Sequence, residues 1–326
     1  LDDGSEMLTK GLSQGKVKWG NYIVNVVGGT FNDGDVTIND DPRKIKDYKI
    51  IVTAKLLFDS SKTQTMEFVL DFKANYTADF SGRQGDDAAW ASKGQSGATG
   101  SNNSKGDGGP GQKGQRGEDG RKGGNGQNGD AVDVYVSAFP DASGKTMLRV
   151  YVKSRSSSRE GFYIVNPDGG SITILARGGR GGQGGHGGDG GGGGYGGNGH
   201  SRGGDSGDTF YGTGGTGGDG GDGGNGGDGG DGGNGGSITI FVDPSASAYV
   251  SVIKFDTSGG ERGIAGSAGT GQGPGGGGDA DTHGQTGHNG HDGKAGIQGQ
   301  QGQSGPKPLV ITQKVNIDWN TVATGN

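Results

Sequence analysis

The chain lacks cysteine, is poor in apolar residues and contains little proline, and each shortage excludes a class of structure. The absence of cysteine rules out disulfides, thiol nucleophiles and thiolate metal sites. Apolar residues make up 26% of the 326 positions, whereas an ordinary globular domain is closer to half apolar. No stretch approaches the roughly 18 consecutive apolar residues of a membrane span. The net charge of −6 is mild for this length and does not favour a nucleic-acid partner.

Glycine is abundant instead, at 83 of the 326 positions. Glycine loses more conformational freedom on folding than any other residue. A chain so rich in glycine stays disordered unless a dense, backbone-based structure compensates for this loss. For an arbitrary glycine-rich sequence, disorder is therefore the expected state, and a regular glycine pattern is needed to favour a folded structure over it.

Residues 1–80 are predicted to form a small antiparallel β module, suited to docking on a partner. Short β-branched or aromatic stretches alternate there with turns such as Gly28-Gly29 and Asp33-Gly34, a pattern typical of strands joined by tight connections. The expected strands are Tyr22–Val27, Val36–Ile38, Tyr48–Val52 and Met66–Phe72.

From about residue 94 the pattern changes to a period of three. Glycine falls at every third position in six runs that form three consecutive pairs, and two of these runs have the form Gly-Gly-X. The runs lie at 94–109, 111–129, 178–198, 214–234, 260–269 and 284–305. Predicted strands lie between and after the pairs, at Val132–Val136, Leu148–Val152, Ile172–Ile174, Ile238–Val242 and Val315–Trp319. We therefore expect residues 81–319 to form a β platform that projects three glycine hairpins, followed by a tail at 320–326.

A period of three predicts polyproline-II helices. This helix has three residues per turn, rises about 3.1 Å per residue and makes no internal hydrogen bonds, so its N–H and C=O groups must find partners outside it. Glycine on one face lets another backbone approach on that face, and glycine on two faces allows two such approaches. The Gly-Gly-X runs should therefore lie in the middle of a bundle and the Gly-X-Y runs on the outside. The predicted fold class is all-β plus polyproline-II.

The main structural alternative is a collagen triple helix, which also requires glycine at every third position. Collagen-like chains carry about 15–20% proline or more, whereas this chain has 8 prolines in total. Its runs are short, slip in register at Pro110 and are interrupted by strands. Six segments within one chain can pair with one another, so a collagen-like trimer is not expected.

The succession of strand, Gly-Gly-X run and strand resembles the N-terminal glycine-rich domain of Obg-type GTPases. The matching stretches are Ile172–Gly182 and Gly232–Val242. The resemblance implies six polyproline-II helices projecting from a small β barrel. It does not extend to a GTPase: Ser143–Thr146 resembles the end of a phosphate-binding loop, but Phe139 stands where that loop needs its first glycine. Similar glycine-rich packing is found in phage tail-tip adhesins and insect antifreeze proteins, and the overall pattern also resembles collagen-like surface proteins of Gram-negative bacteria.

Metal binding and catalysis are not expected. His288 and His291 lie three residues apart, about 9 Å along a polyproline-II helix, which is wide for two ligands of one zinc ion. The acidic ladder Asp219, Asp222, Asp228 and Asp231 spaces its carboxylates too far apart to share one calcium ion, so we interpret it as a solvated acidic edge. No Ser/His/Asp set or paired catalytic carboxylates stand out, and no cofactor is predicted.

The hairpin ends are the candidate binding sites. They are expected near 108–111, 200–212 and 270–283, and the second carries His200, Phe210 and Tyr211. Trp90 lies in the segment that leads into the first run. Exposed aromatic residues on a rigid tip are favoured at binding surfaces. Alternatively, Phe210 and Tyr211 pack over the end of the bundle, and the sequence leaves both interpretations open.

These features predict a non-enzymatic, extracytoplasmic structural or interaction protein, with protein partners at the cell surface or outer membrane. The first residue is Leu1 rather than Met, which fits a processed or trimmed N-terminus. An adhesin or phage tail-tip receptor-binding protein that uses the hairpin ends is the alternative. Ice binding ranks last, because it requires a flat face of small residues and the outer triplets carry Gln, Arg, Lys, Glu and Asp.

Overall fold

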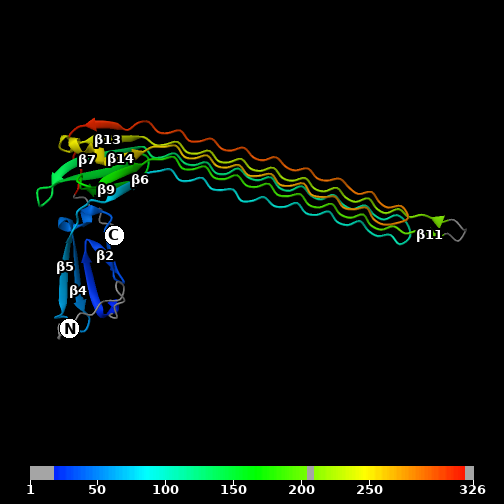
Figure 1. Cartoon of the computed structure of the whole chain (residues 1–326), viewed down its shortest axis with the longest axis horizontal. Helices are drawn as coiled ribbons and strands as arrows, with labels where there is room; N and C mark the ends of the chain where they lie inside the picture. The colour runs from blue at the N-terminus through cyan, green and yellow to red at the C-terminus, as the bar shows by residue number, and fades with distance from the viewer. Residues whose placement is uncertain (1–17, 204–208, 320–326) are drawn as a thin grey trace.

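A computed structural model describes residues 18–203 and 209–319, so the expected tail at 320–326 lies outside the described residues. Figure 1 shows a β-rich base from which a long bundle of extended segments projects. The strands are β1 (Tyr22–Val27), β2 (Gly29–Asn32), β3 (Asp35–Ile38), β4 (Lys49–Leu56), β5 (Thr63–Val69), β6 (Asn75–Asp79), β7 (Val132–Pro140), β8 (Thr146–Ser154), β9 (Glu160–Val165), β10 (Ser171–Leu175), β11 (Arg202–Gly203), β12 (Thr209–Phe210), β13 (Ile238–Val242), β14 (Ile253–Asp256) and β15 (Leu309–Thr312). Short 3-10 helices are η2 (Trp19–Asn21), η3 (Pro42–Lys44), η4 (Lys46–Tyr48) and η5 (Pro244–Val252). The described fold is thus mostly β, with very little helix.

The N-terminal part is an antiparallel β module. Its sheet has the order β1-β4-β5, and β2 and β3 form a separate hairpin. The hairpin turns at Gly34, whose φ of 104° suits glycine. A Cβ at this position would also lie 2.5 Å from Nε1 of Trp19. The four strands expected in this region are confirmed in type and approximate position.

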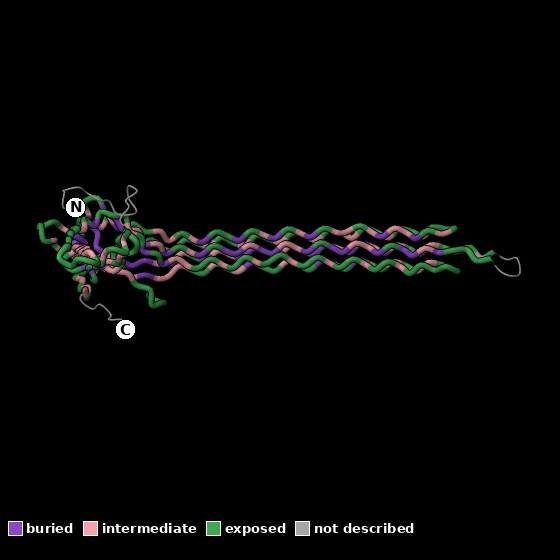
Figure 2. Tube along the Cα trace, turned by 90° about the horizontal axis from the view of Figure 1, so that it is seen from below, coloured by how far each residue is buried: buried purple, intermediate pink, exposed green. Residues whose placement is uncertain are grey.

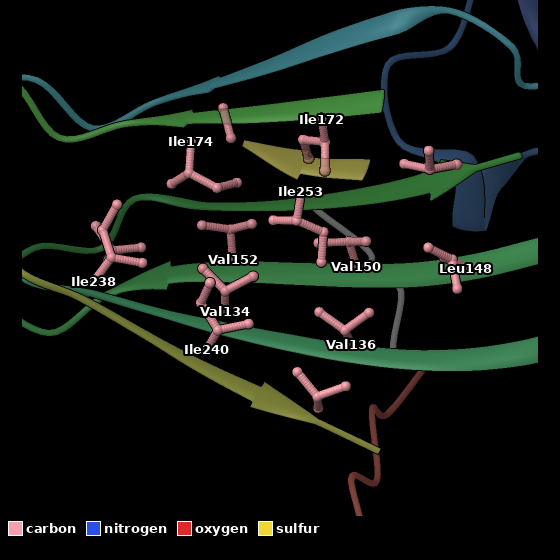
Figure 3. Packing of buried hydrophobic residues seen from close by; sticks show 14 of the residues in the cluster. Val134, Val136, Leu148, Val150, Val152, Ile172, Ile174, Ile238, Ile240 and Ile253 are labelled. Atoms are coloured by element: carbon pink, nitrogen blue, oxygen red, sulfur yellow. The ribbon is translucent and has the colours of Figure 1, made fainter. Parts of the chain in front are cut away.

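The platform consists of two sheets that enclose the main apolar core. One has the order β15-β13-β7-β8-β9 and the other β14-β10-β6. Branched aliphatic side chains from both sheets meet between them (Figure 3). β6 lies inside the range 1–80 expected for the module, yet it pairs in parallel with β10, so the platform begins before residue 80.

Each glycine run continues a platform strand. We name the runs in chain order as the first (81–103), second (107–129), third (177–199), fourth (213–236), fifth (257–278) and sixth (284–306). The first, third and fifth runs leave the sheet of β6, β10 and β14, and the other three return into β7, β13 and β15. The parallel strands of the two sheets therefore continue as two rows of parallel runs.

Backbone hydrogen bonds join these rows along their length. In the outgoing row, Gly82 N–H donates to Arg177 C=O at 2.8 Å, and the same bond recurs every third residue as far as Asn103. Antiparallel bonds connect the rows, as from Gly191 N–H to Gln115 C=O at 2.8 Å. The third and fourth runs are each bonded to four other runs, whereas the first and sixth are bonded to two. The two Gly-Gly-X runs therefore lie in the middle, as their two glycine faces predict.

Close approach, rather than unusual backbone angles, explains the glycines of the runs. The described residues with positive φ lie in turns and connections outside the six runs. Within the runs, a Cβ added to a glycine that faces a neighbour would typically lie about 2 Å from a backbone atom, as at Gly221 beside Gln115 O at 2.0 Å. Figure 2 shows buried residues recurring along the middle of the bundle.

Three expectations about boundaries are wrong. The first hairpin turns at 104–106 rather than near 108–111, because Gly109 N–H already donates to Ser101 C=O. The first run starts at residue 81 rather than 94, because Ala88 and Ala91 stand at glycine positions and hide the period. The final strand is β15, whereas the expected strand at 315–319 has no partner strand among the described residues.

Candidate functional site

Side chains at the X positions of the central runs form hydrogen bonds across the bundle surface. A Gly-Gly-X run directs two glycines at its neighbours, so its X residue lies at the edge of the row. Asp219 Oδ1 accepts from the backbone N–H of His288 at 2.7 Å, and Asp222 Oδ1 accepts from that of His291 at 2.7 Å. Further bonds of this kind run from Lys294 to Asn225, Ile297 to Asp228, Gln300 to Asp231 and Gln303 to Asn234. The acidic edge is partly exposed to solvent, as expected, and its side chains also form a ladder of acceptors that bonds the sixth run to the fourth.

The same bonds change the acidity of the ladder. Hydrogen bonds from the backbone N–H groups of His288 and His291 lower the pKa values of Asp219 and Asp222, and the charge of Lys113 lowers both further. A carboxylate that accepts such bonds is stabilised in its ionised form. The ladder is therefore a structural feature, and its period of three in the printed sequence is the signal from which it could have been predicted.

The distal tip of the bundle is the candidate binding site. We define it as residues 103–107, 200–203, 209–212 and 279–283, where the three hairpins turn. Backbone bonds hold the turns together: His200 N–H donates to Gly106 C=O and Gly199 N–H donates to Asp279 C=O, both at 3.0 Å. Thr213 and Thr282 form an isolated β bridge. The three turns thus form one end surface.

One hairpin extends beyond the other two at this tip (Figure 1). β11 and β12 pair in it, with Arg202 opposite Phe210. His200 is exposed and Tyr211 is 68% exposed, while the side chain of Phe210 lies outside what the structure describes. The hairpin expected near 200–212 is present, and it brings His200, Phe210 and Tyr211 into one short segment. Because Tyr211 is largely exposed, the interpretation as a cap packed over the bundle end does not account for it.

Trp90 is not part of this tip. Its ring lies against His186 with centroids 4.9 Å apart, and His186 Nδ1 lies 2.6 Å from Ser267 Oγ. Four triplets of the first run separate Trp90 from Asn102, whose side-chain oxygen accepts a bond from Asn198 N–H near the tip. The 79% exposed Trp90 is therefore a separate feature on the side of the bundle.

Among the residues that the structure describes, no three His, Asp or Glu side chains are grouped as a metal site requires. His288 Nδ1 instead lies 3.1 Å from Asp219 Oδ1. No helix in the described part of the chain is long and apolar enough to cross a membrane.

Comparison of the chain with protein-family models, with curated proteins and with solved structures gives no match. The resemblance to the glycine-rich domain of Obg-type GTPases therefore remains a prediction. The function has to be argued from the geometry of the molecule itself.

Proposed function

We propose that this chain is a non-catalytic, extracytoplasmic structural or interaction protein in which a rigid polyproline-II bundle separates a β-rich base from a binding tip. The observation that carries the proposal is the backbone hydrogen-bond network that runs from the platform to the tip. A disordered linker would place the tip at variable distances, whereas a network bonded at every third residue holds it at one distance.

Two features support the assignment of the runs as polyproline-II helices. The bonds to any one neighbouring run recur at every third residue, which is the period of this helix. The runs also lack positive φ values among their described glycines, as this helix requires. At about 3.1 Å per residue, the fourth run (213–236) would be roughly 70 Å long. The projection of three hairpins from a β platform supports the Obg-like arrangement.

The continuity of strands and runs explains how the bundle keeps its register. β10 pairs with β6 at an offset fixed in the sheet, with Leu175 opposite Asp79. The Phe80 N–H donates to Leu175 C=O, and the next bond, from Gly82 to Arg177, already belongs to the bundle. The folded platform therefore aligns the runs, and we propose that it is the template on which they assemble.

Two roles fit such a spacer. In the first, the protein is a subunit of a cell-surface complex, docked through the N-terminal module. In the second, it is an adhesin or phage tail-tip protein that binds through the distal hairpin. The exposed Tyr211 on the most distal hairpin is the specific observation that favours the second role.

The two roles can be separated with matched variants. Fluorescently labelled chain is applied to purified cell envelopes and to intact cells, and binding is compared for Tyr211→Ala and Tyr195→Ala. Tyr195 is a fair control because it is 66% exposed but lies on the side of the bundle. If Tyr211→Ala abolishes binding and Tyr195→Ala does not, the result supports the adhesin role. Binding that survives both changes but is lost on removing residues 1–70 supports the docked subunit. Absence of binding to any surface would contradict both.

A further inference from the structure

A cleft of about 810 Å³ lies where the N-terminal module meets the platform. Its walls come from residues 38–45 of the module, from residues 70–77, which lead from β5 into the first half of β6, and from residues 160–164 of β9. Aromatic packing holds these walls in place: the ring of Tyr48 lies 5.7 Å from that of Phe72 and 5.8 Å from that of Phe139. The cleft is therefore built from both parts of the base and is far from the distal tip (Figure 1).

Two tyrosines and two carboxylates share this cleft. The rings of Tyr76 and Tyr163 are 6.0 Å apart and both side chains are partly buried. Burial raises the pKa of each hydroxyl, and the negative charge of Asp71 adds to the effect at Tyr76, as that of Asp40 does at Tyr163. Each tyrosine therefore has a carboxylate nearby within the same cleft.

Within the part of the chain that the structure describes, no Lys, Arg or His side chain forms an ion pair with either carboxylate. Asp71 accepts a bond from the backbone N–H of Lys73 at 3.2 Å, and Lys73 Nζ pairs instead with Asp168. No hydrogen bond or ion pair to the Asp40 carboxylate is present within residues 18–203 and 209–319. The lining carries four acidic residues and one arginine, so the electrostatic potential in the cleft favours a cation.

One cation of the chain, the guanidinium group of Arg43, already lies in the cleft beside a carboxylate and an aromatic ring. Arg43 forms a bidentate ion pair with Asp41, with Nη2 at 2.8 Å and Nε at 3.0 Å from the carboxylate oxygens. The guanidinium carbon of Arg43 lies 3.5 Å from the centre of the Phe162 ring. A carboxylate beside an aromatic face is the arrangement that recognises organic cations in proteins.

We propose that this cleft binds an organic cation, an ammonium or guanidinium group with an apolar body, between Asp40, Asp71 and the rings of Tyr76 and Tyr163. The charged head is balanced by the two carboxylates, and the apolar body contacts the tyrosine faces. The cation is supplied either by a free small molecule or by a lysine or arginine side chain of a peptide. Both sources share the same recognition chemistry. An occupant would contact the module and the platform together.

The test uses dansylcadaverine, which combines a primary ammonium with an aromatic body, and measures its fluorescence anisotropy with the full chain at low ionic strength. We expect saturable binding that weakens about five- to ten-fold in the double variant Asp40→Asn/Asp71→Asn, because each exposed charge pair contributes a modest amount. Asp33→Asn/Asp47→Asn is the matched control, since it also removes two charges from the module, at positions outside the cleft lining, and must bind as the native chain does.

Competition then identifies the source of the cation. Displacement of the probe by agmatine at lower concentration than by acetyl-Ala-Lys-Ala-amide points to a free cation, and the reverse order points to a peptide side chain. Equal binding of an uncharged dansyl amide would show that only the apolar body is recognised and would overturn the proposal. So would undiminished binding by the double variant, or the absence of saturable binding. The unfolding midpoint of each variant confirms that it is folded.

Discussion

Replacing Gly191 with alanine is expected to destabilise the bundle, whereas the same change at the next residue is not. Gly191 and Gly192 lie within five consecutive glycines, 190–194, of the third run. A Cβ on Gly191 would lie 1.9 Å from Gln95 O, while the nearest atom to a Cβ on Gly192 is Ser96 Oγ at 3.8 Å. The two positions have the same sequence context and differ in what their side chain would meet.

The magnitude follows from the bonds that must yield. To relieve the contact, the first run has to move away from Gly191 by roughly 1.4 Å, since carbon-to-oxygen contacts settle near 3.3 Å. This displacement strains the bonds that hold the first run, from Gln115 N–H to Gln95 C=O, from Gly94 N–H to Asp189 C=O and from Gly97 N–H to Gly192 C=O, each 2.8 Å long. Because an intramolecular hydrogen bond contributes about 1 kcal/mol net, we expect a loss of roughly 2–4 kcal/mol.

The control has the opposite sign. Gly192 is not among the residues with positive φ, so alanine fits its backbone and restricts the unfolded chain, which typically adds about 0.4–1 kcal/mol of stability. Guanidinium unfolding, followed by circular dichroism and by the radius of gyration from small-angle X-ray scattering, gives the free energy of unfolding of both variants. Equal effects of Gly191→Ala and Gly192→Ala would refute the close-packing argument.

Three further predictions concern the ladder, the base and the side of the bundle. The double variant Asp219→Ala/Asp222→Ala should unfold at lower denaturant than the native chain at pH 7, as measured by guanidinium titration. The folded-state pKa values of both groups are lowered. The stabilisation that comes from their ionised forms is therefore present above the unfolded pKa near 4 and is lost as pH falls through the lower folded values. The difference between the two proteins should shrink over this range, and a constant difference would contradict this. Burial, reinforced by the Glu160 carboxylate that accepts its hydrogen bond, raises the pKa of Tyr151 to about 12; Glu160→Gln should bring it closer to 10 in an NMR titration, and no change would exclude that contact. Trp90→Ala should leave tip binding intact, because Trp90 contacts His186 on the bundle side.

The sequence predicted those parts of the fold that depend on local repetition. Two glycines per triplet identified the third and fourth runs as the central ones, because a backbone neighbour needs a face without a Cβ. The sequence did not reveal the start of the first run, since Ala88 and Ala91 interrupt the period there. Alanine occurs in this run because it lies at the edge of the bundle, next to two runs only. Between residues 83 and 127, the backbone N–H groups of the second run donate to the first run at every third residue. The series lacks a bond from the Arg121 N–H, which lies opposite these alanines.

Features that depend on long-range pairing were less accessible. The partnership of β6 with β10 joins residues 96 positions apart, and no local signal encodes that distance. The ladder residue Asp219 and its partner His288 could likewise not be matched without the register of β13 on β15, which aligns the fourth and sixth runs. Of the candidate site residues, His200, Phe210 and Tyr211 lie close in sequence and in the one hairpin expected for them, whereas placing Trp90 required the structure. The junction cleft was missed because its three walls are distant in sequence.

The measurement that tests the account most directly is residue-resolved amide hydrogen exchange of the full chain at neutral pH. If the bundle exists as described, the glycine amides of the third and fourth runs exchange slowly, like those of the platform strands. At the X positions, Asn225, whose N–H donates to Asp119 Oδ1 at 2.6 Å, should exchange more slowly than Asp222, for whose N–H no acceptor lies among the described residues. Exchange of all these amides at the rate of an unstructured chain would contradict the hydrogen-bonded bundle and the rigid spacer proposed from it.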